Sequence, residues 1–113
     1  MTIQKRVQIG ATSTNANILS GSIFEFLPAD MVLNLGFVME GAGLLVTILR
    51  NGEIIAEDVV PNIGAAATTM PKIPDDYMVT EEPFLAGDRL TVKVQNTSGG
   101  ALYLNYAVNY TEV

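Results

Sequence analysis

Carboxylates concentrate in two pairs in the second half of the chain, Asp75-Asp76 and Glu81-Glu82. Loops rich in oxygen ligands can bind calcium, which takes about six to eight of them. The spacing of these four residues lacks the Asp-x-Asp-x-Asp-Gly ladder of a calcium-binding loop. The pattern therefore favours a solvated acidic loop, with a calcium site as the alternative.

Catalysis by carboxylates is the second chemistry to consider. Glu25 and Glu40 lie beside apolar runs, and paired carboxyls act as acid and base in glycosidases. The chain has no histidine and no cysteine, which removes the commonest general base, the commonest transition-metal ligand and the usual nucleophile pairs. Residues 20–22 and 96–98 have the composition of turns rather than of a nucleophile elbow. We therefore expect no enzyme activity, no metal and no cofactor.

A row of side chains near the C-terminus has the composition of a binding surface. Tyr103, Asn105 and Asn109 share one face if residues 101–111 form a strand. An outward tyrosine can stack on a sugar while asparagines hydrogen-bond its hydroxyls, as in a carbohydrate-binding module. The same composition is typical of protein contacts, which we favour, and the carbohydrate-binding module stays open as the alternative.

The composition favours binding to other protein subunits. Apolar residues make up 49% of the 113 residues before the ten glycines are counted. Globular chains average about 45–50% with glycine included, so we expect the surplus to lie in a subunit interface. A net charge of −6, with six basic residues against twelve acidic ones, argues against nucleic-acid binding. No run approaches about 18 consecutive apolar residues, so we expect no membrane span.

Two alternating segments near the C-terminus predict a β-hairpin. Residues 88–95 place Leu90, Val92 and Val94 on one face of a strand. Residues 96–100 include two glycines that can take positive φ, and alternation resumes over 101–111. The expected core face of this last strand comprises Leu102, Leu104, Tyr106, Val108 and Tyr110.

The dipeptide Asn51-Gly52 predicts a second hairpin, because both central residues of a type I′ turn need positive φ. Such a turn fixes which residues of the two strands lie opposite each other. The expected opposite pairs are Arg50 with Glu53, Leu49 with Ile54, Ile48 with Ile55, Thr47 with Ala56 and Val46 with Glu57.

Both faces of this second hairpin are partly apolar. We expect one face to lie on the core of the domain and the other to be a candidate interface with a neighbouring subunit. A patch covered by a loop of the same chain is the alternative. The core face would carry Leu45, Thr47, Leu49, Ile54 and Ala56, and the candidate interface Val46, Ile48 and Ile55, surrounded by Arg50, Glu53 and Glu57.

The remaining segments complete an all-β chain. Residues 21–27 and 31–39 are β-rich runs separated by a proline-containing turn, and residues 61–83 hold four prolines and predict a long connection. No amphipathic stripe of three helical turns is present. About six to eight short antiparallel strands with turns between them predict a jelly roll or β-sandwich.

The N-terminal segment is expected to be a flexible arm. Residues 10–17 are small and polar, so we expect residues 1–19 to form the arm and residues 20–113 the single jelly-roll or β-sandwich domain. Ile3 and Val7 would then contact a partner. Residues 3–9 could instead supply a further strand with these two side chains on its apolar side.

The order of several segments resembles the small jelly-roll decoration, or cement, proteins on the heads of tailed bacteriophages. The resemblance lies in residues 17–28, the Asn51-Gly52 hairpin, the proline-rich connection and residues 86–100, and it spans roughly residues 15–110. It implies an accessory virion protein, made in the host cytoplasm, on the outer surface of the capsid. Such a protein would bind major capsid protein subunits as a small homo-oligomer, a dimer or a trimer. A tail-fibre tip domain would share most of these features.

Overall fold

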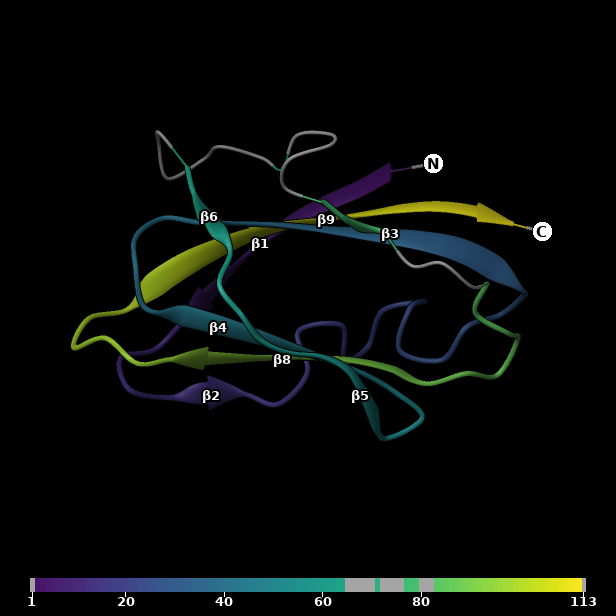
Figure 1. The fold of residues 1–113 in the computed structure, drawn as a ribbon, viewed down its shortest axis with the longest axis horizontal. Helices are drawn as coiled ribbons and strands as arrows, with labels where there is room; N and C mark the ends of the chain where they lie inside the picture. The colour runs from purple at the N-terminus through teal and green to yellow at the C-terminus, as the bar shows by residue number, and fades with distance from the viewer. Residues whose placement is uncertain (1, 65–70, 72–76, 80–82, 113) are drawn as a thin grey trace.

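The chain folds into two β-sheets packed face to face (Figure 1). The computed structural model describes residues 2–64, 71, 77–79 and 83–112. Within these residues no helix is formed, and the expected all-β sandwich is confirmed. The chain passes repeatedly from one sheet to the other, so strands that follow one another in sequence often lie in different layers.

The first sheet, sheet A, has the strand order β1-β9-β3-β6, and β7 pairs with the same edge of β3 as β6 does but at a different stretch. The β3–β6 pair is parallel, which departs from the expected antiparallel pairing. Sheet B has the order β2-β8-β4-β5. The strands of sheet A are β1 (Thr2–Ile9), β3 (Met31–Met39), β6 (Asn62–Ile63), β7 (Tyr77–Val79) and β9 (Leu102–Glu112). Those of sheet B are β2 (Thr14–Asn15), β4 (Leu44–Arg50), β5 (Glu53–Val59) and β8 (Leu90–Asn96).

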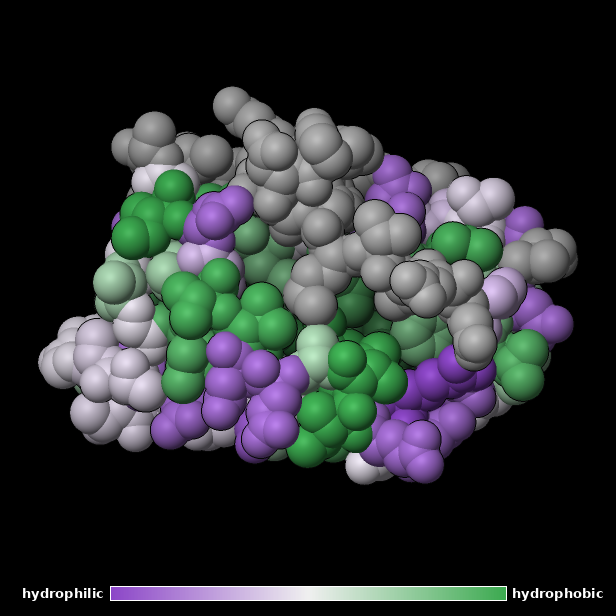
Figure 2. Space-filling model, viewed as in Figure 1, coloured by the Kyte–Doolittle hydropathy of each residue, from purple (hydrophilic) through white to green (hydrophobic). Residues whose placement is uncertain are grey.

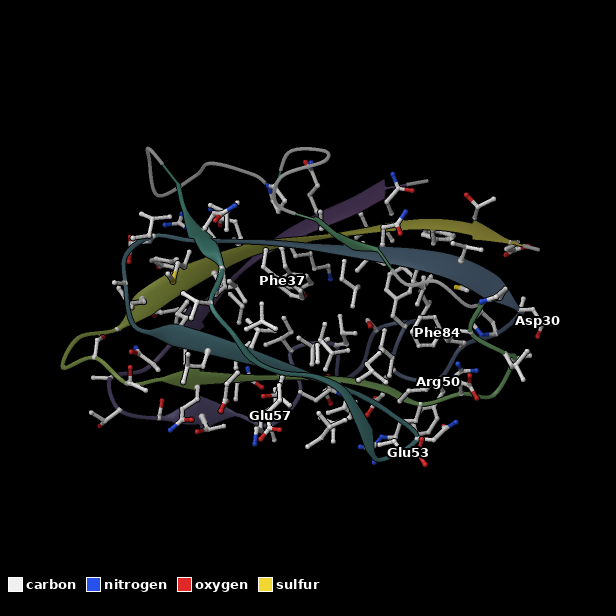
Figure 3. All side chains as sticks on the ribbon, viewed as in Figure 1. Asp30, Phe37, Arg50, Glu53, Glu57 and Phe84 are labelled. Carbon is white, nitrogen blue, oxygen red and sulfur yellow. The ribbon has the colours of Figure 1, made fainter. Side chains whose placement is uncertain are left out.

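The core fills the space between the two sheets with side chains from alternate strand positions. Phe37 on β3 and Phe84 in the segment before β8 point into this space (Figure 3). Because successive strand residues face opposite ways, the alternation seen in the sequence directs every second residue inward. The expected core positions Leu90, Val92 and Val94 of β8 are buried, and so are Leu104, Tyr106 and Val108 of β9.

The expected C-terminal hairpin is wrong, because β8 and β9 do not pair. β8 pairs with β2 and β4 in sheet B, whereas β9 pairs with β1 and β3 in sheet A. A strand has two edges, and both edges of each strand are occupied by other partners. Asn96 helps turn the chain from one layer to the other: its buried amide donates to the carbonyls of Ile9 and Gly100.

The expected N-terminal arm is wrong for residues 2–9, which form β1. This strand pairs with β9 at eight consecutive positions, from Thr2 opposite Asn109 to Ile9 opposite Leu102. Ile3 and Val7 are half-buried against the core, and Ile9 is fully buried. The apolar side of the segment therefore packs within the sandwich, because the exposed edge of β9 would otherwise lack a partner.

The Asn51-Gly52 hairpin is confirmed at its tip. Asn51 has φ 51° and Gly52 has φ 84°, and Arg50 lies opposite Glu53. Beyond Leu49 the expected register is wrong, because two irregularities place Ala56 opposite Ile48 and Val59 opposite Val46. Asp58 has φ 49° at the second irregularity, and its amide donates to the Thr47 hydroxyl at 3.2 Å.

The outer edge of β8 is completed by a segment that is a regular strand only in part. β2 pairs with the C-terminal end of β8, and the amide of Leu27 donates to the Asp88 carbonyl at the other end. Between them Asn17 Oδ1 accepts from the Val92 amide and Asn17 Nδ2 donates to the Leu90 carbonyl. The Ile18 amide donates to the Val92 carbonyl, and the Glu25 carbonyl accepts from the Leu90 amide. Residues 19–24 leave the edge as a loop, so the β-run expected over 21–27 is wrong except for one bridge, Phe26 to Arg89.

Replacing Ile9 by alanine tests whether β1 is integral. We expect Ile9→Ala to lower the free energy of unfolding by about 2–4 kcal/mol, because a buried side chain is truncated and leaves a cavity. Gln8→Ala, on the exposed face of the same strand, should change it by less than about 0.5 kcal/mol. Urea denaturation measures both. Equal free energies of unfolding for the two variants would instead support a mobile N-terminal arm.

Candidate functional site

The candidate interface residues of the central hairpin do not lie together. Val46 and Ile48 are 0% and 2% exposed in the core, so their expected place on a subunit interface is wrong. β4 lies between β8 and β5, and its even-numbered side chains face sheet A. The sequence could not distinguish the two faces because both carry apolar residues. Ile55 and Glu53 lie exposed on β5, which is the edge strand of sheet B.

Arg50, another expected interface residue, is held by Asp88 within the chain. Its Nε donates to Asp88 Oδ2 at 2.8 Å, and its Nη2 lies 2.8 Å from the same oxygen. Its guanidinium carbon lies 5.0 Å from the centre of the Phe84 ring. Arg50 therefore fixes the end of β4 against the turn that precedes β8.

At this end of the sandwich the Asp88 carboxylate accepts hydrogen bonds from several residues. Its Oδ1 accepts from Asn51 Nδ2 at 2.8 Å, and its Oδ2 also accepts from the Leu85 amide at 2.9 Å. Hydrogen bonds from the Asn51 side chain and the Leu85 amide hold the pKa of the Asp88 carboxyl below its ordinary value of 3.8. Burial opposes this lowering of the pKa, and the hydrogen bond and the charge of Arg50 add smaller contributions to it. The hairpin tip and the turn at residues 85–88 are thus joined by one carboxylate.

The row expected around Tyr103 is only partly accessible. Tyr103 is half-buried, and the guanidinium carbon of Arg6 lies 3.6 Å from the centre of its ring. Asn105 is 1% exposed, and Asn109 is half-buried. Asn105 lies on the face of β9 opposite the core, as expected, but its expected exposure is wrong, and the three side chains do not form one open surface.

Ile3 and Val7 are also expected interface residues, and the structure gives them another place. Both side chains face the inside of the sandwich from β1 and pack against the core cluster. Their opposite residues in β9 are Val108 and Leu104, which are buried. Neither side chain is thus presented to a partner on a free arm.

Exposed apolar residues gather instead along the side of the sandwich where the chain crosses from β5 to β6. Figure 2 shows apolar surface along this course, interrupted by hydrophilic groups. We call these residues the apolar strip: Ile54 (54% exposed), Ile55 (46%), Val60 (63%) and Ile63 (59%). Large apolar side chains that remain exposed in a row are typical of a contact surface.

Acidic side chains border the apolar strip. Glu53, Glu57 and Asp58 are exposed on β5, and Figure 3 shows Glu53 and Glu57 on the outer side of sheet B. None of the three takes part in an ion pair among the residues that the structure describes. The border of the strip is therefore negatively charged.

Sequence reasoning identified only one member of the apolar strip, Ile55. Ile54 was expected on the core side, and Val60 and Ile63 were assigned to no surface. Ile54 lies opposite Leu49 as expected, but the face of β4 in the core is that of Leu44, Val46 and Ile48. Ile54 therefore shares the face that points away from the core. Val60 precedes Pro61, and a residue before proline favours extended backbone. The Val60-Pro61 pair was therefore the signal in the sequence that the chain continues in extended form past the hairpin.

Several other expectations concern metal and membrane binding. The acidic residues of the loop at 75–82 lie outside the described residues, so the structure does not test the alternative of a calcium site there. Over the described ranges no group of three or more acidic side chains is placed to hold a metal ion. Over those ranges, too, no helix is long and apolar enough to cross a membrane.

Comparison with known proteins gives a fold likeness alone. No protein-family model and no curated protein matches this chain. Among solved structures, the chain is similar to part of the insecticidal delta-endotoxin Cry8Ea1 from Bacillus thuringiensis, at 15% sequence identity and a TM-score of 0.48. That similarity covers 96% of this chain and 19% of the endotoxin chain. The class of protein that the structure defines is a two-sheet β-sandwich.

Replacing Asp88 by asparagine tests the junction at the hairpin tip. We expect Asp88→Asn to lower the free energy of unfolding at pH 7 by about 1.5–3 kcal/mol, because hydrogen bonds to a charged acceptor are lost. Glu57→Gln removes an exposed charge from β5 and should have little effect.

The pH dependence gives a second readout of Asp88→Asn. The folded-state pKa of Asp88 is lowered, so its contribution to stability is complete above about pH 4 and is lost as the pH falls through the folded pKa. Urea titrations should therefore show the difference between wild type and variant narrowing only below about pH 4. A constant difference down to pH 2 would contradict the role of the charge.

Proposed function

We propose that this chain is a non-catalytic structural protein that binds other protein subunits through the apolar strip, as a decoration protein on a phage capsid. It would bind the major capsid protein on the outer surface of the virion and act as a small homo-oligomer. The apolar strip is the observation that carries the proposal, because four large apolar side chains remain exposed on one side of a small sandwich.

The charge around the strip indicates the kind of partner it fits. Two copies joined edge to edge along β5 would bring Glu53 and Glu57 of one copy close to the acidic residues of the other. The acidic border therefore favours an apolar partner surface surrounded by Lys or Arg. We assign this surface to the capsid subunit, and contacts between copies of the chain to another part of its surface.

The geometry supports protein contact better than sugar binding. A carbohydrate site at Tyr103, Asn105 and Asn109 would need all three side chains at the surface, and Asn105 is buried. The ring of Tyr103 is moreover covered on one side by Arg6. A tail-fibre tip domain could have the same sandwich, and the neighbourhood of the coding sequence distinguishes it from a capsid protein.

Val60→Glu tests the apolar strip directly. Val60 is exposed, so the variant should fold, and a charge at this position should weaken binding to capsid shells by about tenfold or more. Leu85→Glu is the matched control, because Leu85 is a similarly exposed apolar residue at the end of the sandwich near Asp88. The measurement is co-sedimentation of purified protein with shells of the major capsid protein encoded beside it.

Three outcomes count against the proposal. Failure of the wild-type chain to co-sediment would remove the capsid as partner, as would a coding neighbourhood without capsid or portal genes. Equal co-sedimentation of Val60→Glu and wild type would remove the strip as the contact surface. A strictly monomeric chain in size-exclusion chromatography with light scattering would remove the homo-oligomer.

A further inference from the structure

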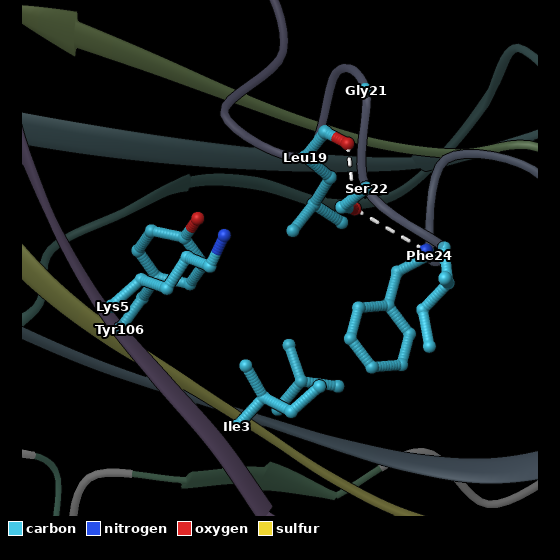
Figure 4. A pocket seen from close by; sticks show the side chains of 9 residues that line it. Ile3, Lys5, Leu19, Gly21, Ser22, Phe24 and Tyr106 are labelled. Atoms are coloured by element: carbon cyan, nitrogen blue, oxygen red, sulfur yellow. Dashed lines mark hydrogen bonds between the residues drawn. The ribbon is translucent and has the colours of Figure 1, made fainter.

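A pocket of about 280 Å³ opens between β1 and the loop at residues 19–24. It lies on the side of the sandwich formed by β1 and β2, opposite the side formed by β5 and β6. Its walls are mostly apolar, from Ile3, Leu19, Ile23, Phe24 and Val108. Figure 4 shows these walls surrounding an open space that none of the drawn side chains fills.

The loop that closes the pocket is held in place at both ends. Leu19 and Phe24 are each 2% exposed and anchor it in the core. The Ser22 hydroxyl donates to the Leu19 carbonyl at 2.7 Å and accepts from the Phe24 amide at 3.2 Å, as the dashed lines in Figure 4 mark. Gly21 supplies the positive φ of 80° that the turn needs. These contacts hold the loop where it forms one wall of the pocket.

The Lys5 ammonium and the Tyr106 hydroxyl lie at one end of the pocket, and the Ser22 hydroxyl lies on the loop wall. Lys5 lies opposite Tyr106 in the register of β1 and β9, and Figure 4 shows the Lys5 ammonium beside the Tyr106 hydroxyl. The hydroxyl donates to the Ile18 carbonyl at 3.4 Å. Among the residues described, Lys5 takes part in no ion pair. The pocket thus presents one cation at the end of an apolar space.

We propose that this pocket binds a small amphipathic monocarboxylate, a medium-chain aliphatic acid of the size of octanoate. The carboxylate pairs with the Lys5 ammonium, and the hydrocarbon chain lies against Ile3, Leu19 and Phe24. Ligand pockets generally measure about 300–1,000 Å³, so a volume of about 280 Å³ selects a ligand at the small end of that range. The net charge of −6 opposes the approach of an anion, so the proposed attraction of the carboxylate depends on the local charge of Lys5.

Lys5 has a second role that needs no ligand. β1 is the edge strand of sheet A, and an inward-pointing charge on an edge strand discourages pairing with another sheet. That role requires only the charge. The proposed binding also requires the pocket to prefer an anion with an apolar chain to a neutral molecule of the same length. A measured preference of this kind therefore distinguishes ligand binding from the edge-strand role of Lys5.

The test is a titration of the isotope-labelled protein, followed through its backbone amide signals, with octanoate, 1-octanol and acetate. We expect saturable shifts with octanoate at β1 and residues 19–24, and at least about fivefold weaker binding of the other two probes. Lys5→Gln should weaken octanoate binding about fivefold, and Lys5→Arg should retain it. Lys93→Gln, which removes an exposed charge from β8, should leave it unchanged.

Any of the following three results would overturn the proposed binding of a monocarboxylate. Absence of saturable shifts would mean that the pocket takes no such ligand. Equal binding of octanoate and 1-octanol, unchanged in Lys5→Gln, would mean that the carboxylate is not recognised. Shifts centred on the apolar strip would mean detergent-like adsorption at that surface. The proposed capsid binding is tested separately by Val60→Glu, since the apolar strip and the pocket lie on opposite sides of the sandwich.

Discussion

The outer edge of β8 is the constraint that shapes this molecule. A strand edge inside a sandwich must have its amides and carbonyls satisfied, and the chain meets this need with β2, the Asn17 side chain and the backbone near Leu27. Because the Asn17 side chain, the Ile18 amide and the Glu25 carbonyl bond to Leu90 and Val92, residues 19–24 are free to leave the edge. They turn inward, bury Leu19 and Phe24, and form one wall of the pocket.

The opposite side of the sandwich is shaped by a break in regular pairing. The register of β4 and β5 slips twice, and Asp58 takes a positive φ where its amide meets Thr47. Such irregularities bend a strand and increase its twist. The chain then crosses to sheet A at β6 and leaves Val60 and Ile63 exposed. The pocket and the apolar strip thus both form where an edge of sheet B departs from regular strand pairing.

The candidate surfaces were harder to predict than the fold, since they depend on these departures. The alternation in β3, β8 and β9 was enough to predict a sandwich and much of its core. Of the expected interface residues, Val46 and Ile48 lie in the core, Asn105 is buried and Arg50 pairs with Asp88. The pocket residues Lys5 and Tyr106 were not singled out together, because they become neighbours only through the pairing of β1 with β9.

The sequence by itself determined what depends on near neighbours in the chain. Asn51-Gly52 adopts positive φ because those two residues tolerate it, and Leu90, Val92 and Val94 share a face because a strand alternates. Only the tertiary structure decided which strands pair. β8 and β9 adjoin in sequence and read as a hairpin, yet each strand has two edges, and distant strands occupy all four. Competition for those edges is non-local, so no turn signal between neighbouring strands could reveal it.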